Sequence, residues 1–131
     1  MVIDSSALVA ILCGEPESRA FIEIIAGAPV RLISAATLLE SGIVIESRRG
    51  EHAGRELDLF LHRAKFEVVA VDAGQVEIAR EAFRRYGKGR DAAGLNFGDC
   101  FSYALARSRR DSLLFKGEDF ARTDITPALR S

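Results

Sequence analysis

Cysteine is scarce in this sequence, and that limits what can hold the fold together. The 131 residues include two cysteines, Cys13 and Cys100, which lie far apart and outside any CxxC or Cys/His ligand spacing. This pattern excludes a disulfide framework and a zinc site. Because free cysteine is among the residue types most often buried, we expect two reduced thiols in the core.

Long hydrophobic runs and surplus charge are also missing. The N-terminal run VIDSSALVAILCG contains Asp4, follows no Lys or Arg, and has too few apolar positions for a membrane span. With 18 basic and 19 acidic residues the formal net charge is -1, so no overall field draws the molecule to nucleic acid or an anionic membrane. We expect a soluble, cytoplasmic protein without a membrane partner, whose binding rests on local patches.

Internal repeats, linkers and low-complexity segments are likewise not seen. A chain of 131 residues with 48% hydrophobic content is large enough to bury roughly two-thirds of its unfolded surface in one core. The sequence therefore predicts a single domain spanning residues 1–131.

Short strand-like runs alternate with helical patterns along this domain. The strand-like runs are residues 2–3, 30–33, 66–71 and 112–115. Helical spacings of apolar residues occupy residues 5–12, 16–27, 36–49, 52–65, 73–86 and 97–110. Strands separated by helices imply right-handed crossovers. We therefore predict a three-layer α/β/α fold with a central, mainly parallel sheet and helices on both faces.

Two segments carry more specific expectations. The continuous apolar run FEVVAV, residues 66–71, suits a buried parallel strand. In the helix over 36–49, apolar residues cluster on one side, which we expect to face the core: Leu38, Leu39, Gly42 and Ile43. Asp72 with Gln75 forms a capping box for one helix, and Asn96 caps another.

Acidic residues follow the strands. Asp4 comes after the first strand, Asp99 lies in the first turn of a helix, and Glu118 and Asp119 follow the last strand. Ligands collect at the carboxyl ends of the strands in such folds. Two carboxylates about 4 Å apart repel by roughly 4 kcal/mol at an effective dielectric of 20, so a cluster requires raised pKa values or a bound cation. Hard oxygen ligands point to Mg²⁺ or Mn²⁺.

Each acid also has an ordinary structural interpretation. Asp4 can be the N-cap of the first helix, and Asp99, three residues after Asn96, stabilises a helix N-terminus. Glu118 and Asp119 lie in a K-G-E-D turn. For a site acid on the helix over 36–49, the apolar arc would favour Glu46 rather than Glu40.

Four motifs, taken together, resemble a known family. They are VIDSSAL at residues 2–8, LLES at 38–41, LNFGDCFSYALA at 95–106 and LLFKGEDFARTDI at 113–125. Each is weak alone, but in this order along the chain they resemble the PIN-domain ribonucleases, and most closely the VapC toxins of toxin–antitoxin modules. The resemblance implies a PIN-like α/β/α fold and metal-dependent cleavage of RNA by activated water.

The resemblance also assigns residues to the site. Four acids would bind Mg²⁺, with Mn²⁺ as a substitute: Asp4, Glu40, Asp99 and Asp119. Gly117 stands where many family members have the fourth acid, so Glu118 and Asp124 remain alternatives to Asp119. Four polar residues would line the site: Ser5, Ser6, Thr37 and Asn96.

Partners follow from the same resemblance. RNA must be held beside an acidic site, so basic residues have to offset the repulsion of its phosphates. The candidates are Arg84, Arg85, Lys88, Arg90 and Arg107. A small VapB-like antitoxin and a second copy of the chain are the expected protein partners, and two apolar sets could form such surfaces: Phe21, Ile24 and Ile25, or Val44 and Ile45.

Two other functions remain open at this point. A phosphoacceptor receiver domain is also a doubly wound sheet with acids at strand ends, and Lys116 follows the last strand as a receiver lysine would. Against it, the first strand lacks a paired acid. The second alternative is a non-catalytic PIN-like module that binds RNA or a protein.

Overall fold

The computed structural model describes residues 1–129 and contains one four-stranded sheet. Its strands are β1 (Val2–Ile3), β2 (Leu32–Ser34), β3 (Glu67–Val69) and β4 (Leu113–Leu114). They run in the spatial order β3-β2-β1-β4, and every pairing is parallel. Parallel strands need crossover connections, which the helices between them supply.

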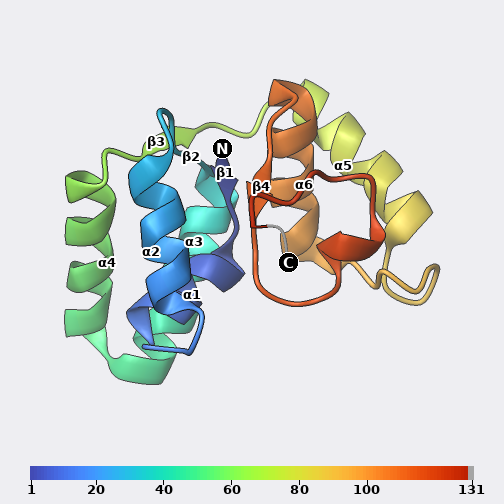
Figure 1. Ribbon diagram of the computed structural model, residues 1–131. Coiled ribbons are helices and arrows are strands. Elements are labelled where there is room, and N and C mark those ends of the chain that lie inside the picture. The colour runs from blue at the N-terminus through green and yellow to red at the C-terminus, as the bar shows by residue number, and fades with distance from the viewer. Residues whose placement is uncertain (130–131) are drawn as a thin grey trace.

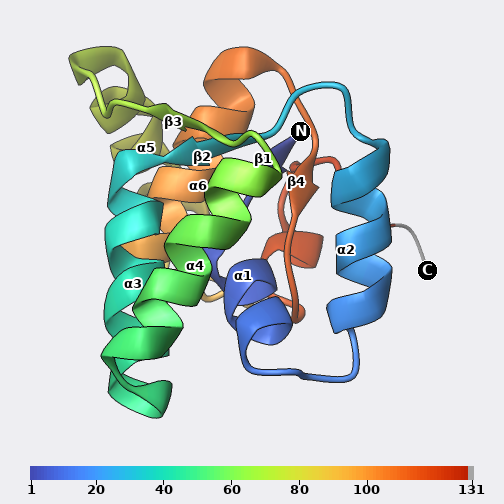
Figure 2. The ribbon, with the colours of Figure 1, turned by 90° about the vertical axis from the view of Figure 1, so that its left-hand side faces the viewer.

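Helices cover both faces of this sheet (Figures 1 and 2). On one face lie α1 (Ser5–Leu12), α2 (Ser18–Gly27), α3 (Ala35–Arg49) and α4 (Glu51–Arg63). On the other face lie α5 (Ala73–Tyr86) and α6 (Phe97–Arg109), and a short 3₁₀ helix, η1 (Phe120–Arg122), follows β4. The predicted three-layer α/β/α architecture is confirmed.

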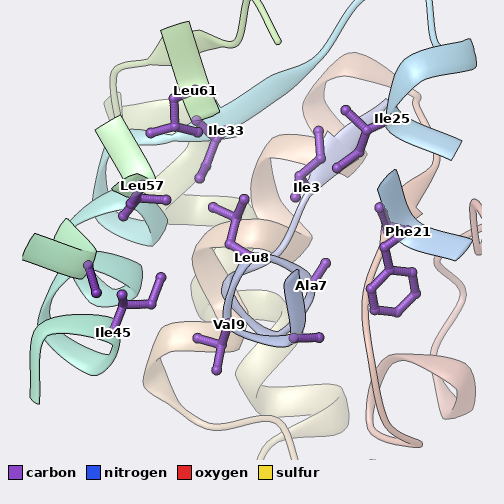
Figure 3. Packing of buried hydrophobic residues seen from close by; sticks show 13 residues of the cluster. Ile3, Ala7, Leu8, Val9, Phe21, Ile25, Ile33, Ile45, Leu57 and Leu61 are labelled. Carbon is purple, nitrogen blue, oxygen red and sulfur yellow. The ribbon is translucent and has the colours of Figure 1, made fainter. Parts of the chain in front are cut away.

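The strands divide the core in two because their side chains alternate between the faces. Ile3 belongs to the hydrophobic cluster beneath α1–α4, whereas Val2 belongs to the cluster beneath α5 and α6. In Figure 3, Ile3 and Leu8 lie at the centre of the first cluster, with Leu57 of α4 on one side and Phe21 of α2 on the other. All four are at most 1% exposed.

Local signals set several helix ends as predicted. The Asp72 side chain accepts a hydrogen bond from the backbone N–H of Gln75 at 2.8 Å and caps α5. The reciprocal half of the predicted box does not form, because the Gln75 amide donates to the Ala70 carbonyl at 3.1 Å instead. Gly50, at φ +87°, separates α3 from α4. The second helix begins at Ser18 rather than in the turn that holds Pro16.

The prediction of a buried strand over residues 66–71 was wrong. β3 covers only Glu67–Val69 and lies at the edge of the sheet, where it pairs with β2 alone. Val68 is 48% exposed. The composition of an apolar run does not reveal whether the strand is central or at an edge. That depends on which strands and helices pack beside it.

The predicted inner face of α3 was wrong at two of its four residues, whereas Leu38 packs partly buried against the core. Leu39 is 66% exposed and Ile43 57% exposed, whereas the buried residues of α3 are Thr37, Ser41 and Ile45. Thr37 contacts Ser102 of α6 through their hydroxyl groups, 3.2 Å apart. The inward face of α3 therefore combines the apolar Ile45 with two buried hydroxyl residues, a combination that the apolar arc does not predict.

The apolar residues suggested as protein-binding surfaces are mostly core. Phe21, Ile25 and Ile45 are at most 2% exposed, and Ile24 and Val44 are partly buried against them. Of the cysteines, Cys100 is buried and Cys13 half-buried, and both are free thiols. No helix within residues 1–129 combines the length and apolarity needed to cross a membrane.

Candidate active site

Asp4 directly follows β1 and is almost completely buried, with 2% of its surface exposed. It is the N-cap of α1, as its alternative interpretation predicted: Oδ2 accepts from the Ser6 N–H at 3.1 Å and from the Ser6 hydroxyl at 2.7 Å. Its other oxygen, Oδ1, accepts from the Ser102 hydroxyl of α6 at 2.5 Å. Capping accounts for one oxygen of this carboxylate, and the second faces another element.

Glu40 approaches the same region from the second turn of α3. Its Oε1 accepts a hydrogen bond from the Ser5 hydroxyl at 3.0 Å. The carboxylate also lies over Gly98 of α6, where a Cβ atom would be only 2.3 Å from Oε2. Gly98 therefore makes room for this acid. Glu46, which the helical wheel favoured, is exposed and lies against Gly54 of α4.

Asp99 lies in the first turn of α6. Its Oδ2 accepts from the Asn96 N–H at 3.0 Å while the Asn96 side chain accepts from the Asp99 N–H at 2.9 Å, which completes a capping box. The pKa of Asp99 is raised to about 6, chiefly by burial and to a smaller extent by the charges of Asp4, Asp119 and Glu40, while the hydrogen bond from Asn96 lowers it. Asp99 thus completes the capping box of α6, and its pKa responds to the other three acids.

Asp119, at the start of η1, is one of the charges that act on Asp99. The two alternatives for the fourth acid are directed elsewhere. Glu118 lines a hollow with Phe21 and Ile125, and Asp124 accepts from the Tyr103 hydroxyl at 2.6 Å and lies 3.6 Å from the Arg107 guanidinium. The Asp124 carboxylate also raises the pKa of Tyr103, as does burial, the larger cause.

The acids Asp4, Glu40, Asp99 and Asp119, hereafter the acid cluster, form a chemically suitable donor set for a hard divalent cation. Within residues 1–129, no three Asp, Glu, His or Cys side chains converge closely enough to ligate one ion. Each of Asp4, Glu40 and Asp99 accepts a hydrogen bond from a serine or asparagine instead. The carboxylate oxygens, and the pKa of Asp99 that burial and neighbouring acids raise, nevertheless fit Mg²⁺ or Mn²⁺.

The expected lining residues have distinct contacts in the structure. Ser5 donates to Glu40, Ser6 donates to Asp4, and Asn96 pairs with Asp99. Thr37 does not contact an acid and reaches Asp4 only through Ser102, which sequence reasoning missed. Ser102 lies three residues after Asp99, in the next turn of the same helix, and this spacing was the available signal. The buried Ser34 hydroxyl at the end of β2 has no hydrogen-bond partner among residues 1–129.

The basic candidates fall into two groups. Arg84, Arg85, Lys88 and Arg90 are exposed residues at the end of α5 and in the loop that leads to Asn96. Arg107 lies apart from them, roughly 12 Å along α6 from Asp99, and pairs with Asp124.

Lys116 does not make the contact that a receiver domain would require. Its ammonium group lies 2.7 Å from Glu15 and 2.9 Å from Glu17, in the turn between α1 and α2. Its backbone N–H donates to the Ser6 hydroxyl at 3.0 Å. The lysine therefore joins β4 to the α1–α2 turn, and its charge is neutralised there rather than by Asp4 or Asp99.

Substituting Gly98→Ala should displace the Glu40 carboxylate without unfolding the protein. The clash is with the end of a flexible side chain, and alanine is favoured over glycine in helices by roughly 1 kcal/mol. We expect Mn²⁺ affinity to fall about tenfold with no loss of thermal stability. Gly74→Ala is the matched control, because Gly74 is also the second residue of its helix and its added Cβ would lie 3.5 Å from the nearest atom. Equal Mn²⁺ affinity in the two variants would contradict the proposal that Gly98 makes room for a Glu40 carboxylate that binds the ion.

Substituting Asp99→Asn should change how stability depends on pH in the metal-free protein. The folded-state pKa of about 6 lies above the ordinary value of 3.8, so the folded chain binds more protons between these values and stability falls as pH rises through 6. Asparagine retains the acceptor for Asn96 but does not titrate. The variant should therefore gain thermal stability over the wild type from pH 4 to pH 7, measured in EDTA. Parallel profiles would show that Asp99 titrates normally.

The comparisons with known proteins agree over nearly the whole chain. The PIN domain family model matches residues 1–125. A protein of Mycolicibacterium smegmatis named Ribonuclease VapC is 62% identical over 125 residues, covering 95% of this chain and 97% of the relative. Ribonuclease VapC30 of Mycobacterium tuberculosis is 58% identical over 125 residues, covering 95% of each.

Solved structures show the same fold at low sequence identity. The structure of VapC20 from Mycobacterium tuberculosis, described as a sarcin-ricin loop cleaving toxin, matches with a TM-score of 0.81 and 22% identity, covering 99% of this chain and 98% of that one. A toxin-antitoxin complex from Klebsiella pneumoniae matches with a TM-score of 0.71 and 19% identity, over 99% and 98% of the two chains. The family match and the identity to VapC relatives exclude the receiver interpretation: the chain belongs to the PIN domain family and, within it, to the VapC group.

Proposed function

We propose that this protein is a Mg²⁺- or Mn²⁺-dependent endoribonuclease and the toxin of a type II toxin–antitoxin pair, which hydrolyses RNA phosphodiester bonds at the acid cluster. The observation that carries the proposal is that α6, which holds Asp99, also meets two of the other acids: Ser102 donates to Asp4, and Gly98 lies against the Glu40 carboxylate. The raised pKa of Asp99, to which Asp4, Glu40 and Asp119 contribute after burial, supports it. The proposal is also supported by relatives that are 58–62% identical to this chain and are named ribonucleases.

The chain itself contributes anionic ligands and their orientation. Asp4, Glu40 and Asp99 would hold a divalent cation, which supplies an acidified water and stabilises charge on the phosphoryl group and the leaving 3′-oxygen. Asp119 is exposed and makes no capping bond, so its carboxylate is available to hold a second ion or to orient the attacking water. No protein nucleophile is required.

RNA would be held beside the acids by the basic residues at the end of α5. Arg84, Arg85, Lys88 and Arg90 project from the segment that leads into the helix carrying Asp99. The Arg85 guanidinium stacks on Tyr86, 4.8 Å from the ring centroid, and Arg90 lies 5.9 Å from that of Phe83. These positive charges would offset the repulsion between RNA phosphates and the acid cluster.

An antitoxin and a second copy of the chain complete the proposed assembly. Solved complexes named VapBC2 of Rickettsia felis and the toxin-antitoxin pair of Klebsiella pneumoniae share this fold. Leu39 and Ile43 on α3 and Phe97 on α6 are more than half exposed, and such apolar side chains suit a protein interface. Cellular RNA as substrate and an antitoxin as partner imply action in the cytoplasm.

Neutralising the acids should abolish RNA cleavage and leave the fold intact. We expect Asp4→Asn and Asp99→Asn to reduce cutting of a total RNA pool to background in Mg²⁺ or Mn²⁺, and EDTA to do the same to the wild type. Asp119→Asn should cost about 10- to 100-fold, whereas Glu118→Gln, one residue earlier, should cut like the wild type.

Wild-type turnover by either Asp4→Asn or Asp99→Asn would remove the catalytic role of the cluster. No cutting by well-folded wild-type protein in any metal would favour the non-catalytic binding module instead. A loss in Glu118→Gln equal to that in Asp119→Asn would reassign the fourth acid.

Removing the charges of Arg85, Lys88 and Arg90 together should weaken RNA binding and flatten its salt dependence. Three lost phosphate contacts correspond to a slope of log affinity against log salt shallower by about 2. Binding would be measured with the inactive Asp99→Asn protein so that the RNA stays whole. The control removes three exposed charges that precede β3 and β4, at the opposite edge of the sheet: Arg63, Lys65 and Arg109. An equal change in both triple variants would place the RNA elsewhere.

A further inference from the structure

The carboxylate of Asp4 is held from two sides, and one of them is remote in sequence. Ser6 supplies two donors to Oδ2 within the first turn of α1, which any good N-cap would receive. The donor to Oδ1 is Ser102, which is fully buried on α6 and lies 98 residues away along the chain. Helix capping does not require this second bond, so it needs another explanation.

The hydroxyl protons of this region have one consistent arrangement. Ser102 has a single hydroxyl proton, which it donates to Asp4 at 2.5 Å. The hydroxyl groups of Thr37 and Ser102 are 3.2 Å apart, and either could donate in isolation. Because the proton of Ser102 is already used, Thr37 must be the donor. A directed chain therefore runs from Thr37 to Ser102 to Asp4.

Thr37 is itself in a buried setting that its polarity does not explain. It is 1% exposed on the face of α3 that packs toward α1 and α6, while Leu39 and Ile43 are left in solvent. Ser41, one turn later on the same face and fully buried, donates to the Thr37 carbonyl at 2.8 Å. The helix thus buries hydroxyl groups where an ordinary amphipathic helix would bury leucine.

We infer that Ser102, oriented by Thr37, is a positioning residue for Asp4: the two hydroxyls fix the plane of the Asp4 carboxylate from the α3–α6 side while Ser6 fixes it from α1. Neither residue touches substrate. The inference rests on the proposed function, since Asp4 must be oriented for the cation and the RNA that this function requires. Hydroxyl donors suit this task because they orient a carboxylate without cancelling its charge.

Four variants test whether the chain of hydrogen bonds from Thr37 through Ser102 to Asp4, hereafter the relay, orients Asp4 or whether these residues act only by packing. Ser102→Ala removes the donor to Asp4. Thr37→Val retains the volume of Thr37 and loses its hydroxyl, and Thr37→Ser does the opposite. Ser41→Ala is the matched control, because it removes an equally buried hydroxyl that bonds to a backbone carbonyl instead of the relay. Thermal unfolding establishes that each variant is folded at the temperature of the assays.

Two measurements read the relay without RNA cleavage. Mn²⁺ affinity, from electron paramagnetic resonance of free Mn²⁺, should fall about tenfold in Ser102→Ala and roughly threefold in Thr37→Val. Thr37→Ser and Ser41→Ala should stay within about twofold of the wild type, far less than loss of a ligand contact. In the metal-free protein, the ¹³C shift of the Asp4 carboxyl should move in Ser102→Ala and not in Ser41→Ala.

The outcomes distinguish the relay from the proposed function. Equal Mn²⁺ affinity and equal Asp4 shifts in Ser102→Ala and Ser41→Ala would overturn the relay, even if Asp4→Asn abolishes cleavage. A loss in Thr37→Ser as large as that in Thr37→Val would show that Thr37 acts by packing. If the wild type cuts no RNA while the Asp4 shift still responds to Ser102→Ala, the relay stands as a device that orients Asp4 and the nuclease proposal fails.

Discussion

The burial of carboxylates at one edge of a parallel sheet is the constraint to which this structure responds. Asp4 is nearly inaccessible to solvent, and Asp99 is buried enough for its pKa to rise to about 6 with three acids nearby. The donors that meet these acids are hydroxyl and backbone N–H groups: Ser5 for Glu40, Ser6 and Ser102 for Asp4, and Asn96 for Asp99. Such donors hold carboxylates in place while leaving their negative charge to attract a cation.

Two features of the sequence lead to much of this arrangement. Caps are local, so Asp4, Asp72 and Asn96 can be recognised from the residues that follow them. The alternation of strand and helix predicts the layers, because parallel strands require crossovers. For Asp4 and Asp99, capping and membership of the acid cluster had seemed to compete, but the structure combines them: a helix N-terminus brings a carboxylate to the carboxyl edge of the sheet.

Other parts of the site depend on contacts between segments that are distant in sequence, and these could not be predicted from the sequence. Glu40 rather than Glu46 lies near Asp99 because its carboxylate packs against Gly98 of α6, whereas that of Glu46 packs against Gly54 of α4. Ser102 matters because α6 packs beside β1, and its spacing from Asp99 on the helix does not by itself reveal that it reaches Asp4. The apolar arc of α3 was misleading, since hydrophobic periodicity assumes that a buried face is apolar, and this helix buries Thr37 and Ser41 instead.

The backbone N–H of Lys116 donates to the same Ser6 hydroxyl that donates to Asp4, and this contact has a consequence for the order of events in synthesis. The first helix of the chain acquires its complete set of bonds only after the last strand has docked beside β1. The acid cluster spans residues 4–119, so it depends on contacts of very large sequence separation, which are slow to form. A chain still emerging from the ribosome therefore cannot present the complete acid cluster until the segment that follows its final strand has been made.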